Sequence, residues 1–403
     1  MNCYVSIKIE LLCKYQEYLF LVFYLNTRLK GMIINMQSDY QNIILSNDCE
    51  VFELPIHIYD VDVTTDCWIY SRLAIIKTSP YYNEWVASHY NLYATDKFNF
   101  HFGNMNLYPP SYHDEILKRA PLRLLQLKQD NLIKLLKYYI KNGNYIVMTI
   151  KPYKNKEYYH EVVFYGFNDF KQCLLCVGLK NEKFQKILFE YKYLEETLQD
   201  IQKYFFDKIH RGLHLALNFQ YPLTIMKLND SFRPNNCAFE AFAKLKHELF
   251  GEKIDISKAN SLKSYEPSTR VHKGISCLDV FEDMLKNEIS GSQFDRNFRG
   301  IVSATKKLLE HRTMLLCSMK YLCDVWGSSL KEDAENNIKL YNQCKNIIEK
   351  WFFLSLKYKF TKNIELLKTI LLEIPVVFDK EKQSLSLFVN NSFDLNKLNR
   401  SFL

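Results

Sequence analysis

Hydrophobic residues in the first half of the chain form short runs of the kind that make β-strands. Residues 51–59 (VFELPIHIY) predict an edge strand, because the internal proline removes a ladder hydrogen bond. Residues 145–150 (YIVMTI), 158–167 (YYHEVVFYGF) and 173–179 (CLLCVGL) are separated by a polar connector and an Asn-Asp turn. We therefore expect an antiparallel meander of three strands over this region.

Helical periodicity is found before and after this meander. A helix is predicted over CWIYSRLAII from residue 67, because Thr64, Thr65 and Asp66 are of the residue types that cap helix N-termini. A second helix is predicted over residues 131–141, whose apolar positions recur every three or four residues. Further helical patterns cover residues 194–206, 237–250, 276–288, 298–325, 331–358 and 366–372.

The segment 207–234 shows no regular pattern and contains two prolines, so it predicts a domain boundary. The expected fold class is α+β, with a domain of helix and antiparallel sheet over residues 36–206 and an α-helical domain over 235–403. Residues 1–35 are set apart as an N-terminal extension, in which Met32 is an alternative start. The apolar run in this extension has eight residues (YLFLVFYL), whereas a membrane span needs about 20.

Composition narrows the classes of function. The 403 residues are 48% hydrophobic and 24% charged, which is typical of a globular protein and not of a disordered one. The net charge of +8 includes no run of five basic residues, so we expect neither a nucleic-acid nor a membrane partner. The 11 cysteines follow no regular framework, which predicts a cytoplasmic protein with reduced thiols. Neither a nucleotide-binding glycine motif nor H-E-x-x-H occurs.

A cysteine at a helix start, followed by a histidine on a strand, is the candidate chemistry. Cys67 begins the first predicted helix, where unpaired N–H groups and the helix dipole stabilise a thiolate. His160 lies on the middle strand of the meander. An imidazole held against the thiol would accept its proton and return it to a leaving group, and the N–H of Cys67 would help to form an oxyanion hole. Each residue alone is more often structural, so the pair in this order is the informative feature.

Other cysteines are weaker candidates. Cys237 also starts a predicted helix, but its possible bases, His247 and His272, are expected in the helical region, where no strand would present them. Cys173 and Cys176 form C-x-x-C on a strand, where residues three apart point to opposite faces. A zinc site would also need a second pair of ligands, so no metal is expected.

Two stretches of the chain resemble known families. The run DCWIYSRLAII, then a helix, HEVVFYGFND and a further strand, resembles the papain-like core of bacterial leader-processing cysteine peptidases. More closely, residues 45–325 resemble the butirosin biosynthesis protein H-like group of specialised-metabolite gene clusters, in which a papain-like domain precedes a helical region. GISCLDVFEDML (274–285) and FDRNFRGIVSATKKLLEHRTMLL (294–316) are similar to that group's carboxy-terminal helices.

The resemblance implies an amide-forming acyl transfer in natural-product biosynthesis, as in a relative from closthioamide assembly. Cys67 would take the acyl group from a phosphopantetheine thioester on an acyl or peptidyl carrier protein, and His160 would transfer protons. A small-molecule amine would then resolve the acyl-enzyme, with no further cofactor. Lys151, Lys154 and Lys156 are candidates for contact with the acidic carrier protein, although a solvated loop is the commoner role of such residues.

The chain departs from the family pattern at two points. The position for a third catalytic residue falls near Gly178, which has no side chain, so Asn181 would orient the imidazole instead. The oxyanion-hole glutamine before the cysteine is replaced by the sequence YDVD at 59–62. Both departures disfavour the alternative of a cysteine peptidase or amidase more than they disfavour acyl transfer. They leave a non-catalytic papain-like binding module as the alternative from another class.

Overall fold

The structure is a computed structural model, and it describes most of the chain from residue 50 to residue 391. The described ranges are 50–103, 113–122, 132–151, 160–181, 183–197, 223–255, 270–291, 300–327 and 334–391. All of them belong to one compact unit, Glu50–Leu403. The N-terminal extension set apart from the sequence, residues 1–35, lies outside the described residues.

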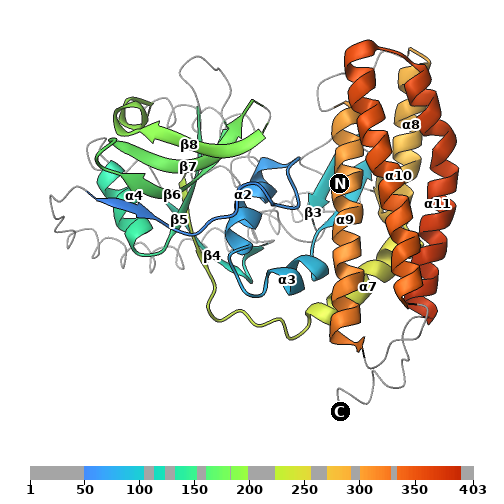
Figure 1. Ribbon diagram of the computed structural model, residues 1–403, viewed down its shortest axis with the longest axis horizontal. Coiled ribbons are helices and arrows are strands. Elements are labelled where there is room, and N and C mark those ends of the chain that lie inside the picture. The colour runs from blue at the N-terminus through green and yellow to red at the C-terminus, as the bar shows by residue number, and fades with distance from the viewer. Residues whose placement is uncertain are drawn as a thin grey trace, which may run out of the picture. The chain divides into compact units, whose positions relative to one another are not determined.

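The larger sheet is antiparallel and contains the predicted meander. Its seven strands follow the order β4-β9-β5-β6-β7-β8, with β1 paired to β6 (Figure 1). The strands are β1 (Val51–Glu53), β4 (Leu117–Leu122), β5 (Tyr145–Ile150), β6 (His160–Asn168), β7 (Cys173–Lys180), β8 (Lys183–Glu190) and β9 (Leu223–Leu228). The expected meander is confirmed as β5, β6 and β7, and β8 extends it by one strand.

The two faces of this sheet pack against different helices. Alternate side chains of β5 and β6, such as Val147 and Val163, share a hydrophobic core with α2 (Cys67–Ile76). On the other face, Lys137 of α4 (Leu132–Lys141) lies over the ring of Phe167. This two-sided packing explains why β5, β6 and β7 are almost entirely buried, whereas a sheet with one solvated face would alternate.

A smaller sheet joins segments that lie far apart in the sequence. Its order is β10-β11-β2-β3, formed by β2 (Asn91–Thr95), β3 (Phe100–Gly103), β10 (Glu252–Asp255) and β11 (Arg270–Lys273). Two of these strands come from each side of the expected boundary at 207–234. The expectation that this boundary segment is irregular is wrong at β9, which pairs with both β4 and β5. The smaller sheet thus contains strands from both sides of the boundary, the larger sheet takes β9 from the boundary segment itself, and the division into domains stays a prediction.

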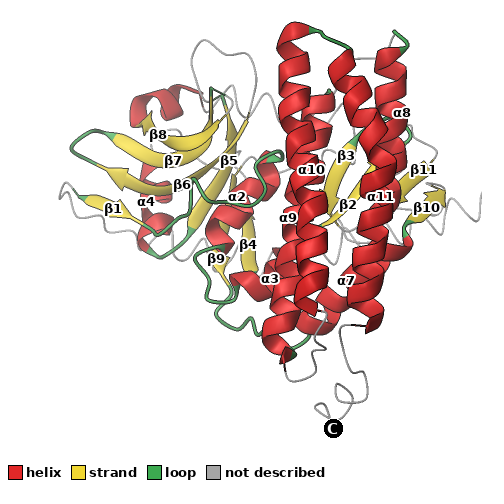
Figure 2. Cartoon of the chain, turned by 45° about the vertical axis from the view of Figure 1, so that its right-hand side comes forward, coloured by secondary structure: helices red, strands yellow, loops and turns green. Residues whose placement is uncertain are grey.

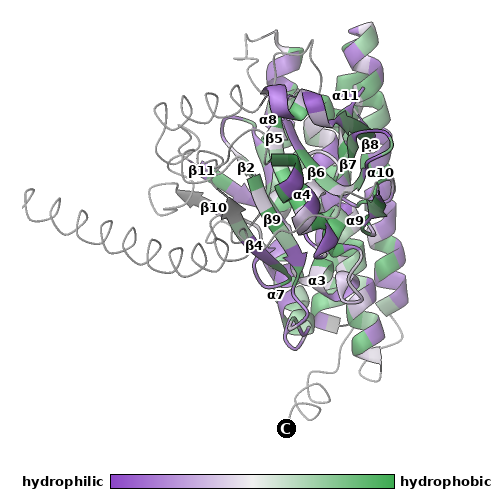
Figure 3. Ribbon diagram, turned by 90° about the vertical axis from the view of Figure 1, so that its left-hand side faces the viewer, coloured by the Kyte–Doolittle hydropathy of each residue, from purple (hydrophilic) through white to green (hydrophobic). Residues whose placement is uncertain are grey.

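The second half of the chain is helical, as predicted, and its long helices pack side by side (Figure 2). Together with α3 (Tyr82–Ser88), this layer contains α7 (Cys237–Phe250), α8 (Cys277–Ile289), α9 (Ile301–Val325), α10 (Ala334–Thr361) and α11 (Glu365–Asn391). Figure 3 shows hydrophobic and hydrophilic residues interspersed along α10 and α11, as expected for helices with one buried face. Throughout the described ranges, each helix is either too short or too polar to cross a bilayer.

The last helix is much longer than predicted. Its sequence pattern indicated only residues 366–372, but α11 continues through Pro375 to Asn391. Proline removes one backbone hydrogen bond and normally ends or kinks a helix. The helix continues here because its apolar face is buried on both sides of the proline. Leu367 and Ile370 before the proline and Val377 after it are among the buried residues.

A close approach between α7 and the turn before α8 depends on Gly274. Its φ is +59°, and a Cβ at this position would lie 2.7 Å from the carbonyl oxygen of Glu248. Gly291 has a similar φ of +71°, but no atom lies within 4 Å of the corresponding Cβ position. Alanine at Gly291 would therefore introduce backbone strain alone, whereas alanine at Gly274 would introduce both backbone strain and steric overlap.

We expect Gly274→Ala to lower the free energy of unfolding by about 3 kcal/mol, because it adds overlap with backbone to left-handed strain. Gly291→Ala should cost only about 1 kcal/mol, from strain alone. Urea denaturation of the two variants measures the difference. Equal losses would contradict the tight packing of α7 against this turn.

Candidate functional site

Helix α2 begins at Cys67, as the sequence predicted. The Cys67 side chain is partly exposed, and the hydroxyl of Ser71 donates to its carbonyl oxygen at 2.7 Å. The first turn of a helix has N–H groups without intrahelical acceptors, and these stabilise negative charge. The thiol therefore occupies the position on α2 that most favours a thiolate.

The residues before Cys67 do not cap the helix in the expected way. Asp66 occupies the N-cap position, but its side chain makes no capping hydrogen bond. Its two carboxylate oxygens instead accept from Nζ of Lys307 in α9, at 2.9 and 2.8 Å. The predicted capping role is therefore wrong for this side chain, because a buried cation from a distant helix is its partner.

A second residue of α9 binds the two threonines. The Thr64 N–H and hydroxyl both donate to Oε1 of Glu310 at 2.8 Å, and the Thr65 hydroxyl donates to Oε2 at 2.5 Å. Burial raises the pKa of the Glu310 carboxyl, and these donors act in the opposite direction. The approach to Cys67 is thus held by α9 at three successive residues.

The contact between Lys307 and Asp66 also involves strand β3. The side chains of Lys307 and Asp66 are only 1% and 5% exposed, and Lys307 also donates to the carbonyl oxygen of Phe100 in β3 at 2.6 Å. Removing a buried charge from its partner leaves the other charge without compensation, which is strongly destabilising. Helix α9, strand β3 and the start of α2 are therefore coupled through one ammonium group.

His160 is the first residue of β6, the strand that packs beneath α2. Arg72 of α2 forms an ion pair with Glu161, next to His160. Since side chains alternate along a strand, Glu161 and Val163 face α2, and His160 starts toward the opposite face. The imidazole can approach α2 only around the end of the strand.

At that end of the strand, an aromatic side chain contacts both His160 and α2. The ring centroid of Phe184 in β8 is 6.2 Å from that of His160 and 3.6 Å from that of Tyr70, on which it stacks. Nδ1 of His160 lies 3.0 Å from the carbonyl oxygen of Glu161. The structure thus brings the strand of His160 and helix α2 together, and the pairing of Cys67 with His160 stays a prediction.

Asn181, the third proposed catalytic residue, is explained by the backbone conformation of the turn in which it lies. Asn181 lies in the turn between β7 and β8 with an exposed side chain and a φ of +52°, which asparagine adopts more readily than most residues. A Cβ at Gly178 would lie 2.8 Å from Cγ1 of Val162, so that position has little room for an orienting side chain. The catalytic role of Asn181 stays a prediction.

The segment that replaces the oxyanion-hole glutamine lies near the other end of α2. Lys77, which follows the last residue of α2, contacts the carboxylates of Asp60 and Asp62 at 3.4 and 3.7 Å. Ten helical residues span about 15 Å, so these carboxylates are far from Cys67. A carboxylate also lacks the proton that an oxyanion-hole donor needs.

Among the rival cysteines, Cys237 begins α7 as predicted but is buried, and burial raises the pKa of its thiol to about 11. One expectation about its possible bases is wrong, since His272 lies on strand β11 and not in a helix. Cys173 and Cys176 are both buried, and burial raises the pKa of each thiol. These thiols are protonated at neutral pH and are poor nucleophiles.

Other sequence-predicted features add little to the site. Of the connector lysines, Lys151 is partly exposed, and Lys154 and Lys156 lie outside the described residues. The eight cysteines of the described ranges are free thiols. In the same ranges, no group of three His, Cys, Asp or Glu residues is arranged to hold a metal ion.

Sequence reasoning missed Lys307 and Glu310. Both lie inside the predicted helix 298–325, in the run KKLLEHR, where four charged or polar side chains that include His311 and Arg312 are almost fully buried. His311 contacts the Glu248 carboxylate of α7 at 3.1 Å, so the same helix also makes a buried polar contact within the helical layer. The signal that could have identified Lys307 and Glu310 was the high density of charged residues within a helix that buries most of its surface.

Comparison of the chain with protein-family models gives no match, and comparison with curated proteins gives none either.

We expect Lys307→Met to lower the free energy of unfolding by about 3 to 5 kcal/mol, because it leaves the buried Asp66 carboxylate without its cation. Lys306→Met is the matched control, since the neighbouring ammonium lies over the ring of Phe352 at 5.5 Å and acts on Glu310 through its charge alone, and it should cost less than about 1 kcal/mol. Chemical denaturation measures both losses. A Lys307→Met protein as stable as the control would show that the ion pair does not hold the start of α2.

Proposed function

We propose that this protein is a cysteine-dependent acyltransferase with a papain-like domain, which forms an amide from a carrier-protein thioester and an amine. One observation carries the proposal: Cys67 is the partly exposed first residue of a helix whose preceding residues are held by buried side chains of α9. A helix that only packs in the fold does not need buried charged side chains to hold the residues before its first turn. A nucleophile does need a fixed position, because a small displacement from the reacting carbon costs much of the rate.

The proposed reaction has two steps. Sγ of Cys67 attacks the thioester carbonyl, its proton passes to His160, and the carrier's phosphopantetheine thiol leaves with that proton. The amine nitrogen then attacks the acyl-cysteine, gives a proton to His160 and displaces the Cys67 thiolate, which recovers the proton. The Cys67 N–H stabilises the oxyanion in both steps.

A thioester donor suits the residues that are present. A thiol is a better leaving group than an amine, so a Cys–His pair without a strong third residue is sufficient for a thioester. Cleavage of a peptide bond would make greater demands on proton transfer and on the oxyanion hole. The exposed position of Asn181 and the acidic residues 60 and 62 therefore favour acyl transfer over the peptidase alternative.

A second candidate function is a non-catalytic binding module. It is favoured by the alternation of β6, which directs His160 away from the α2 face, and by the crowding at Gly178. In such a module, the contacts from α9 would stabilise the fold alone. The two candidates differ in whether Cys67 forms a covalent bond with an acyl donor.

The test uses a benzoyl thioester of N-acetylcysteamine as the donor and intact-protein mass spectrometry as the measurement. We expect one benzoyl group on Cys67, none on Cys67→Ala, and unchanged labelling of Cys237→Ala, which is the matched control. His160→Ala should slow acylation by about 100-fold, because it removes the proton acceptor. Added benzylamine should release the label as an amide.

Labelling on several cysteines at similar rates, or none on Cys67, would overturn the acyltransferase and leave the binding module. Release of benzoate at the same rate with and without the amine would favour the amidase alternative.

A further inference from the structure

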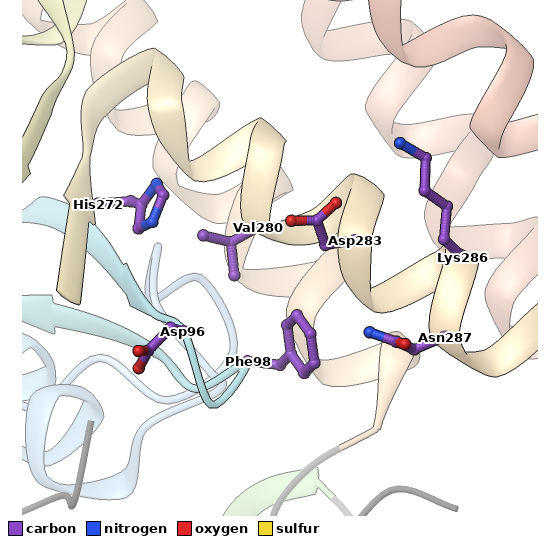
Figure 4. Close-up of a pocket in the computed structure, with 7 residues that line it drawn as sticks. All are labelled: Asp96, Phe98, His272, Val280, Asp283, Lys286 and Asn287. Carbon is purple, nitrogen blue, oxygen red and sulfur yellow. The ribbon is translucent and has the colours of Figure 1, made fainter. Parts of the chain in front are cut away.

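A cavity separate from α2 and β6 lies between the turn that connects β2 and β3, strand β11 and helix α8 (Figure 4). Its volume is about 340 Å³ and it opens to solvent. This is enough for a small molecule of about ten heavy atoms. Its lining residues are Asp96, Phe98, His272, Val280, Asp283, Lys286 and Asn287.

The lining carries two carboxylates and one ammonium group. Asp96 and Asp283 come from different walls, and Figure 4 shows the Asp283 carboxylate directed toward the cavity and that of Asp96 turned away from the other lining residues. The ammonium of Lys286 points away from the other lining residues and pairs with Glu282 at 2.6 Å. The charge of Lys286 is therefore balanced mainly by Glu282, outside the cavity, with a smaller contribution from Asp283.

The imidazole of His272 adds a neutral polar group. Burial lowers its pKa, with a further lowering from the charge of Lys253, so the ring is neutral at pH 7. Lys253 in turn contacts the carboxylate of Asp279 at 3.0 Å. A neutral imidazole can accept or donate a hydrogen bond without repelling a cation.

The apolar part of the lining is an aromatic ring and a branched side chain. Phe98 stands beside Val280 in Figure 4, and its ring forms part of the cavity wall. The electron-rich face of a phenyl ring attracts a cation and also accepts apolar groups. The cavity thus combines negative charge, a π-face and hydrogen-bonding groups on separate walls.

We propose that this cavity binds a small organic cation, an ammonium group with an apolar substituent. The carboxylate of Asp283 would attract the charge, and Phe98 with Val280 would contact the substituent. An anion would face this carboxylate, and the lining lysine, Lys286, already pairs with Glu282. The proposal is independent of the chemistry of Cys67.

The probe is 4-fluorobenzylammonium, titrated into the full-length protein at low ionic strength and followed by fluorine NMR. Neutral 4-fluorobenzyl alcohol and anionic 4-fluorobenzoate have the same ring and serve as matched ligands. We expect saturable binding of the ammonium, binding of the alcohol that is at least fivefold weaker, as for loss of one exposed ion pair and one cation–π contact, and no saturation with benzoate.

Two variants locate the binding. Asp283→Asn should weaken ammonium binding by about fivefold, because it removes one carboxylate from the wall. Asp379→Asn on α11 is the matched control, since it removes the same charge from an exposed position on another helix, and it should change nothing. Phe98→Gly should abolish saturation, and because glycine adopts the φ of +60° at this position without strain, its loss of stability should be limited to the packing of the ring against the core.

The proposal is overturned if the alcohol or benzoate binds as tightly as the ammonium. It is equally overturned if Asp283→Asn and Phe98→Gly, both folded by thermal unfolding, bind the ammonium as the wild type does.

Discussion

The ammonium of Lys307 in α9 binds two distant parts of the chain, the residue before α2 and strand β3, and the arrangement around Cys67 depends on it. It binds both oxygens of Asp66 and the carbonyl oxygen of Phe100, in surroundings that exclude water almost completely. A buried charge is stable only while its partners are in place, so α9, β3 and the start of α2 must assemble together. Glu310, one turn further along α9, extends the same constraint to Thr64. The position of Cys67 follows from these contacts.

This constraint gives the proposed chemistry its physical basis. A helix N-terminus favours a thiolate, and a fixed N-terminus also fixes the direction in which the thiol points. The two other proposed catalytic residues are placed less favourably. His160 begins its strand on the face away from α2, and Asn181 occupies an exposed turn. The balance between acyltransferase and binding module therefore depends on whether the imidazole reaches the thiol around the end of β6.

Local patterns were sufficient to predict the start of α2 and the meander of β5 to β7, because each single helix or strand is encoded within about ten consecutive residues and the strands follow one another along the chain. They failed where distant residues decide the structure. Asp66 has the side chain of an N-cap residue, but a buried lysine 241 positions away competes for its carboxylate. The pairing of β2 with β11, and the place of β9 between β4 and β5, bring together short strands whose own patterns are weak. The predicted helix 366–372 was too short, because tertiary burial outweighs the local cost of Pro375 and α11 continues through it.

The most direct test of the activated helix start is the pH dependence of iodoacetamide alkylation, measured for each cysteine by peptide mass on the native protein. An ordinary thiol reacts with a midpoint near its pKa of about 8.5. We predict that Cys67 alone reacts rapidly at about pH 6 to 7, and that His160→Ala slows this reaction while leaving the other cysteines unchanged. Reaction of Cys67 no faster than that of the partly exposed Cys317 and Cys323 would contradict the account.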